Sequence, residues 1–150
     1  MKPCTILDLA KVADVATKHF GEDATLWART KLYSPIDKLF YFNENLVLLI
    51  EAIGQYKYSI HTIGRTNKVK EYRDFTINAG SWMFDNTTCT CLIAFAAASS
   101  LRMQRFIGLT GGKRVGVIPD AGGIEDEIMY VYPIRDRIEL EDRVCQQFRQ

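Results

Sequence analysis

The chain has 150 residues, of which 47% are hydrophobic, and its 19 basic and 18 acidic side chains give a formal net charge of +1. This length supports one domain with a substantial core and leaves little room for two, so we expect residues 1–150 to form a single domain. The balanced charge excludes a strong overall field of the kind that gathers nucleic acid or a membrane surface, and such binding would need a local patch.

The cysteine pattern is typical of a reducing compartment. The four cysteines are Cys4, Cys89, Cys91 and Cys145. They include no Cys-x-x-Cys pair, and both histidines are distant in sequence, so no metal site is predicted. We expect Cys89 and Cys91 on one face of the same strand, which is poor disulfide geometry. The charged N-terminal stretch does not resemble a signal peptide, and no apolar run reaches membrane-spanning length, so no membrane partner is expected.

The first third of the chain is predicted to be helical after a brief strand at Cys4–Leu7. Asp8 is expected to cap a helix that ends at Gly21 and has one apolar stripe. A second helix, Ala24–Tyr33, is expected to follow Asp23 and to stop before a proline. Its candidate packing residues are Leu26, Trp27 and Leu32.

The middle of the chain predicts an antiparallel meander. Leu39–Phe42 and Leu46–Ile53 are apolar, aromatic and β-branched, and Asn43-Glu44-Asn45 between them has the chemistry of a hairpin turn. A third run, Tyr56–Ile63, alternates polar and apolar residues with the period of a strand.

The second half predicts alternating helices and strands. A helix is expected from Lys68 to about Asn86, although Gly80 weakens the pattern. The expected elements that follow are a strand at Thr90–Ala97, an amphipathic helix within Ser99–Gly112, a strand at Lys113–Pro119 and a closing hairpin strand at Glu127–Ile134. Residues 135–150 are charge-rich and are predicted to form a tail or a short helix.

This element order resembles that of the GNAT (GCN5-related N-acetyltransferase) family. There, a strand is followed by a helix carrying Asn-x-x-Ala-x-x-Leu-Tyr-x-x-x-Gly-Phe. With Gly111 at the glycine, Ser100, Met103, Phe106 and Ile107 stand at the asparagine, alanine, leucine and tyrosine. The resemblance implies an α+β fold with a central twisted, mostly antiparallel mixed sheet and helices on both faces.

The resemblance also implies a coenzyme, acetyl-CoA or CoA, if the protein is active. The family holds a pyrophosphate with Arg/Gln-x-x-Gly-x-Gly/Ala at a helix N-terminus. The corresponding stretch here is Arg65-Thr-Asn-Lys-Val-Lys, so the candidate coenzyme-binding residues are Arg65, Lys68, Lys70 and Ser100. Ile107 cannot supply the hydroxyl with which the family's tyrosine protonates the departing thiolate, and Tyr130 or Tyr132 are alternative sources.

Two residues are candidates for the general base of such a reaction. His61 lies on the third predicted strand, where these enzymes often place a base, and its side chain titrates near neutral pH. Glu51, near the end of the preceding strand, is the second candidate. A histidine on the polar face of a sheet and an exposed carboxylate at a strand end are the alternative interpretations of both residues.

The run from Lys68 to Asp74 together with Arg105–Gly112 resembles small virion or head-assembly proteins of short-tailed bacteriophages. The resemblance implies a non-enzymatic protein of the infected bacterial cytoplasm or the virion, with phage structural or assembly proteins as partners. This is the preferred hypothesis, and a divergent acyl-CoA-dependent N-acyltransferase is the alternative. A third hypothesis is a nucleic-acid-binding or inhibitor protein acting through Arg102, Arg105, Lys113 and Arg114.

Overall fold

The computed structural model of the chain describes residues 1–120, 123 and 125–133. The elements in chain order are a 3-10 helix η1 (Ile6–Asp8), α1 (Leu9–Phe20), α2 (Thr25–Tyr33), β1 (Lys38–Asn43), β2 (Leu46–Ala52), β3 (Lys57–Gly64), α3 (Val69–Asn86), β4 (Cys91–Ala97), α4 (Leu101–Leu109), β5 (Lys113–Ile118) and β6 (Glu127–Pro133). The tail or short helix predicted for residues 135–150 lies outside the described residues.

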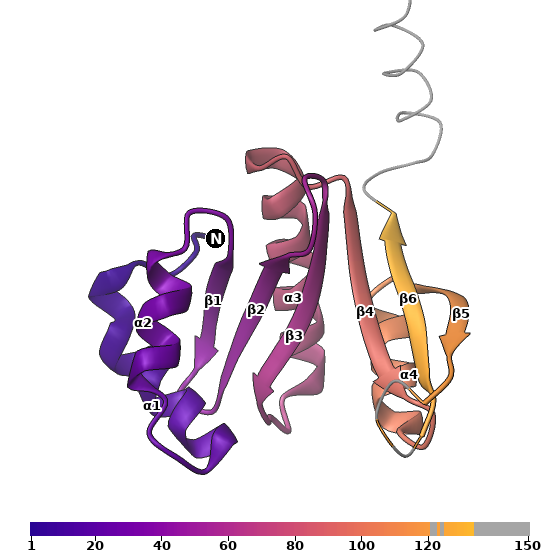
Figure 1. Cartoon of the computed structure of the whole chain (residues 1–150), viewed down its shortest axis with the longest axis horizontal. Coiled ribbons are helices and arrows are strands. Elements are labelled where there is room, and N and C mark those ends of the chain that lie inside the picture. Colours follow the sequence, from indigo (N-terminus) through magenta and orange to yellow (C-terminus); the bar gives the residue numbers. More distant parts are fainter. Residues whose placement is uncertain (121–122, 124, 134–150) are drawn as a thin grey trace, which may run out of the picture.

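The six strands form one twisted sheet with the order β1-β2-β3-β4-β6-β5 (Figure 1). The pairs β1–β2, β2–β3, β4–β6 and β5–β6 are antiparallel, and β3–β4 is parallel. The connection between the parallel strands runs through α3. The mixed, mostly antiparallel sheet predicted from the sequence is therefore confirmed.

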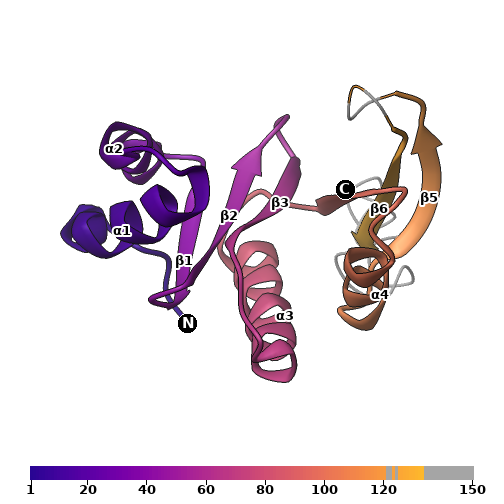
Figure 2. The same ribbon diagram turned by 90° about the horizontal axis from the view of Figure 1, so that it is seen from below.

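Helices cover both faces of this sheet (Figure 2). The apolar stripe of α1 packs with α2 against one face, where Val12, Ala28 and Leu39 belong to a single core cluster. On the other face, α3 contributes Met83 to a second cluster that includes Phe40. Leu39 and Phe40 are adjacent in β1 and enter different cores because successive side chains of a strand point to opposite faces.

The strand predicted at Cys4–Leu7 is wrong, because a local capping arrangement takes its place. The Thr5 side chain accepts a hydrogen bond from the Leu7 N–H at 3.3 Å, and the Thr5 N–H donates to the Asp8 carboxylate at 2.9 Å. This reciprocal capping box forms the N-terminal cap of η1. The segment keeps one hydrogen bond to the sheet, from the Cys4 N–H to the Leu39 carbonyl of β1 at 2.6 Å.

Two further expectations are corrected by the structure. Leu26 is 74% exposed and does not pack, because α2 turns Ala28 to the core and leaves Leu26 toward solvent. Cys89 does not share a strand with Cys91. The backbone N–H groups of Thr90 and Cys91 both donate to the Tyr56 carbonyl, so β4 begins only at Cys91 and Cys89 is buried in the preceding loop.

At Gly64 the end of β3 packs closely against the hairpin turn between β1 and β2. Its φ is +112°, and a Cβ atom there would lie 2.0 Å from the Asn45 carbonyl oxygen. The Gly64 N–H donates to His19 Nδ1 at 3.1 Å, and the next N–H, of Arg65, donates to the same Asn45 carbonyl at 3.2 Å. Glycine is therefore required for both its conformation and its lack of a side chain.

Replacing Gly64 with alanine is expected to lower the free energy of unfolding by roughly 2 kcal/mol or more, from left-handed strain combined with the clash against Asn45. Urea unfolding followed by circular dichroism measures this. Gly54→Ala is the matched control, because its Cβ would meet its nearest neighbour at an ordinary 3.8 Å. Equal unfolding midpoints for the two variants would contradict the tight approach at Gly64.

Candidate active site

The two halves of the sheet separate where the pairing of β3 with β4 ends. The parallel ladder comprises only Lys57 with Cys91, Tyr58 with Leu92 and Ser59 with Ile93. Beyond these pairs, β3 stays bonded to β2 and β4 stays bonded to β6, and the two strands diverge toward the lower edge of Figure 1. The divergence opens the sheet between two strands that would otherwise be neighbours.

A cavity of about 340 Å³, here called the main cavity, lies at this opening. Its walls come from α1, β2, β3, α3, β4, α4 and β6, and include His61, Thr62, Phe95, Tyr72 and Phe106. Tyr72 and Phe106 stack with ring centroids 5.2 Å apart and planes inclined by 10°. The stack joins α3 to α4 and forms a flat aromatic wall.

Two hydrogen-bonded hydroxyl pairs involve residues that line the main cavity. Tyr72 Oη lies 2.6 Å from Thr62 Oγ1, and Tyr132 Oη lies 2.6 Å from Thr110 Oγ1. Burial raises the pKa of Tyr72 to about 12, against the opposing effect of the Thr62 hydroxyl. Burial likewise raises the pKa of Tyr132, and the Thr110 hydroxyl partly offsets it. Both phenols are therefore protonated at neutral pH.

His61 and Glu51, the two candidate bases, are brought together on the sheet face covered by α1 and α2. His61 Nε2 lies 2.8 Å from Ser59 Oγ and 3.9 Å from Glu51 Oε1. Glu51 also forms an ion pair with Lys31 of α2, whose ammonium lies 3.8 Å from Asp37. His61 lines the main cavity, whereas Glu51 does not line it and reaches the site through its contact with the imidazole.

The surroundings of His61 favour its neutral form. Burial is the largest effect and lowers the pKa of His61, the Glu51 carboxylate raises it, and the Lys31 ammonium lowers it. The net result is a pKa below the usual histidine value of about 6.5. At neutral pH the side chain is an uncharged imidazole, which is the form that accepts a proton.

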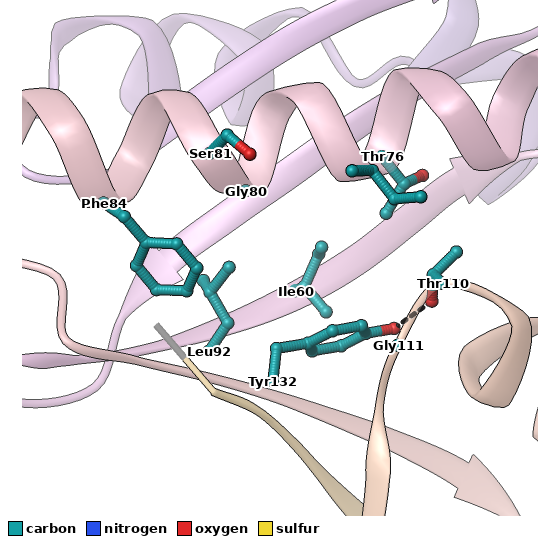
Figure 3. Close-up of a pocket in the computed structure, with 10 residues that line it drawn as sticks. Ile60, Thr76, Gly80, Ser81, Phe84, Leu92, Thr110, Gly111 and Tyr132 are labelled. Atoms are coloured by element: carbon teal, nitrogen blue, oxygen red, sulfur yellow. Dashed lines mark hydrogen bonds between the residues drawn. The ribbon is translucent and has the colours of Figure 1, made fainter. Parts of the chain in front are cut away.

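A second cavity, of about 280 Å³, lies between α3 and the end of α4 (Figure 3). Phe84 and Gly80 of α3 line one side, and Tyr132 of β6 lines the other, with Leu92 and Ile60 between them. In Figure 3 the Tyr132 hydroxyl points along the cavity toward Thr110. This space is called the second cavity below.

None of the four candidate coenzyme-binding residues lines the main cavity. Arg65 is in the loop after β3, Lys68 is the N-cap of α3 and Lys70 is in its first turn, and all three are exposed. Ser100 is the N-cap of α4 and its side chain makes no capping hydrogen bond. The three cationic side chains are thus gathered at the start of α3, where backbone N–H groups are unpaired and the helix dipole is positive.

The basic residues considered for nucleic-acid binding are separate from this opening. Arg102 and Arg105 are exposed on α4, and Lys113 and Arg114 are exposed on β5. None of the four lines either cavity. Their role in binding a partner stays a prediction.

Sequence reasoning missed Tyr72, Thr62, Thr76 and Lys31. Tyr72 and Thr76 follow the apolar spacing of α3, which predicts only that they are buried in the core. Thr62 belongs to an alternating strand pattern, which predicts no function for it. The sequence pattern does not point to Lys31 either, because Lys31 and its ion-pair partner Glu51 are 20 residues apart and lie on different elements. Tyr132, considered as a source of a hydroxyl, does line the main cavity.

Comparisons with known proteins show which solved structures share this fold. No protein-family model matches the sequence, and no curated protein matches it. Among solved structures, an N-acetyltransferase from Staphylococcus aureus is 16% identical with a TM-score of 0.72, over 89% of this chain and 96% of that one. A GNAT-family acetyltransferase from Bacillus cereus is 13% identical with a TM-score of 0.66, over 88% and 94%.

A third match is a spermidine/spermine N-acetyltransferase from Vibrio cholerae, 10% identical with a TM-score of 0.71, over 92% of this chain and 94% of that one. The chain therefore has the fold of the GNAT acetyltransferases, as the resemblance of its sequence implied. Nothing among these matches concerns a bacteriophage protein, so the virion-assembly hypothesis stays a prediction.

Residues 1–120, 123 and 125–133 contain no group of three or more His, Cys, Asp or Glu side chains placed to hold a metal ion. Within the same ranges, no helix combines the length and the apolar character needed to cross a membrane.

The two charges beside His61 are expected to move its pKa in opposite directions. Glu51→Gln removes the carboxylate that stabilises the imidazolium and lowers the pKa, and Lys31→Gln removes an opposing cation and raises it. Titration of the His61 ring protons by NMR measures both shifts. Shifts of the same sign in both variants would contradict the arrangement of charges.

Proposed function

We propose that the protein is a divergent acyl-CoA-dependent N-acyltransferase with its active site in the main cavity. The observation that carries this proposal is the opening between β3 and β4, which is lined by a neutral histidine and by two tyrosines that retain their protons. The fold is shared with acetyltransferases, which supports the same class of reaction.

Acyl transfer to an amine needs one group to accept a proton and another to give one. The amine nitrogen attacks the thioester carbonyl, a C–N bond forms and the C–S bond breaks. His61 is the proposed base that takes the proton from the amine, because its imidazole is neutral at neutral pH and faces the cavity. Glu51 then acts through His61, since its carboxylate stabilises the imidazolium that forms.

The departing thiolate needs a proton, and Ile107, at the position of the family's tyrosine, cannot supply it. The Tyr132 hydroxyl is the proposed donor. Tyr132 lines the main cavity, keeps its proton at neutral pH and has the Thr110 hydroxyl as a hydrogen-bond partner. The Thr110 hydroxyl donates its own proton to the Ile107 carbonyl at 2.8 Å, so the Tyr132 hydroxyl donates to Thr110 Oγ1 and must leave that bond to protonate the thiolate.

The phosphates of the coenzyme are proposed to bind at the start of α3. Arg65, Lys68 and Lys70 provide positive charge there, and the first N–H groups of α3 provide unpaired donors. Lysines stand where the family pattern has glycine or a small residue, so binding relies more on charge and less on close backbone contact than in that pattern.

Coenzyme binding tests the proposal directly. Isothermal titration calorimetry is expected to show micromolar binding of acetyl-CoA, weakened at least tenfold in the Arg65→Ala/Lys68→Ala variant because two phosphate-facing charges are lost. Lys18→Ala is the control, since Lys18 lies on α1 and pairs with Asp14. Absence of binding at millimolar acetyl-CoA would refute the proposed function.

His61→Gln is expected to lower kcat by about 10²-fold or more, the usual range for removing a general base, with little change in acetyl-CoA affinity. A spectrophotometric thiol-release assay with a panel of primary amines and polyamines measures this. In the wild type the rate should persist below pH 6.5, because the pKa of His61 is lowered. A variant as fast as the wild type would remove His61 from the mechanism.

A further inference from the structure

We propose that the second cavity holds the acyl chain of a medium-chain acyl-CoA, so that the preferred donor carries about six to eight acyl carbons rather than two. This inference rests on the proposed function and adds a donor class to it. The two cavities adjoin each other, the second one is apolar, and a buried hydroxyl lies at their junction.

The two cavities are neighbours with a shared wall. Ile60, Thr76 and Tyr132 line both of them. Ile60 is the first residue of β3 beyond the last pair with β4, so the junction lies where the strands begin to separate. A thioester bound in the main cavity beside His61 and Tyr132 would therefore have the second cavity directly next to it.

The second cavity suits a hydrocarbon chain in chemistry and in size. Its walls include Phe84, Leu92, Ile77 and Ile60, and none of the described residues that line it is charged. An apolar cavity of about 150 Å³ is large enough to take up benzene, which has six carbons. A volume of about 280 Å³ is therefore sufficient for a flexible chain of about six to eight carbons.

Thr76 places a hydroxyl at the junction of the two cavities. The residue is 5% exposed, and its Oγ1 is buried without a hydrogen-bond partner among the described residues. Its hydroxyl is close enough to Tyr72 to lower the pKa of that phenol as a hydrogen-bonding neighbour, although the two oxygens lack the geometry of a formed hydrogen bond. A buried hydroxyl left unpaired is costly, and the carbonyl oxygen of a thioester at this point would accept its proton.

The alternative occupants suit the second cavity less well. An amine acceptor would bring a cation into walls that carry no carboxylate, and a CoA phosphate would lose contact with the lysines at the start of α3. An acyl chain is uncharged and extends from the thioester itself. Its burial strengthens binding by about fourfold for each methylene group that leaves water.

Calorimetry on the whole chain with CoA, acetyl-CoA, hexanoyl-CoA and octanoyl-CoA tests the inference. Hexanoyl-CoA is expected to bind at least tenfold more tightly than acetyl-CoA. Ser81→Phe is expected to bring this ratio close to one, because Ser81 is exposed yet lines the second cavity and so places the ring at its rim. Asn78→Phe is the matched control, since Asn78 is exposed on α3 and lines neither cavity.

The outcomes separate this inference from the proposed function. Equal affinities for hexanoyl-CoA and acetyl-CoA would overturn the inference and leave the acyltransferase proposal standing. A hexanoyl preference that survives Ser81→Phe would overturn the placement of the chain in the second cavity. If neither CoA nor any thioester binds at millimolar concentration, the proposed function fails and this inference fails with it.

Discussion

The early end of the pairing between β3 and β4 is the constraint on which the rest of the structure depends. After three residue pairs the facing edges of two central strands separate, and each strand stays bonded to only one neighbour. Backbone groups on an unpaired edge need water or a ligand as partners. The aromatic stack of Tyr72 with Phe106 closes one side of the gap, and what is left is a cavity with polar groups from both sheet halves. The chemistry thus lies where secondary structure is incomplete.

Most of the fold could be predicted from the sequence, because its signals are local. The apolar stripe of α1, its glycine stop and the Asn43-Glu44-Asn45 turn all depend on spacings of a few residues. The prediction of a strand at Cys4–Leu7 was wrong because the side chains of Thr5 and Asp8 accept hydrogen bonds from backbone N–H groups of the same segment. The single mixed sheet with helices on both faces was expected from the resemblance to a family, and periodicity alone could not have given it or the order of its strands.

The candidate site was predictable in part. His61 was identified by its chemistry and its strand, and the structure places it in the main cavity. Its partners could not be identified, because Lys31, Glu51 and Ser59 meet only after α2 has packed across the sheet. The isoleucine at the family's tyrosine position lines the main cavity and packs with Ala94 and Tyr130, but it has no hydroxyl to offer there. Phenolic groups reach the cavity from α3 and β6 instead, and the helix motif alone gives no sign of this.

The arrangement of the strands also has a consequence for folding. β1, β2 and β3 follow one another in sequence and pair with their immediate neighbours, whereas β4 reaches β3 only after a crossover containing the 18-residue α3. Contacts that are local in sequence form faster than distant ones. The meander is therefore expected to form first, and β4, β6 and β5 to dock onto it later. His61 belongs to the early unit and Tyr132 to the late one, so the proposed base and acid come together only in the last step of folding.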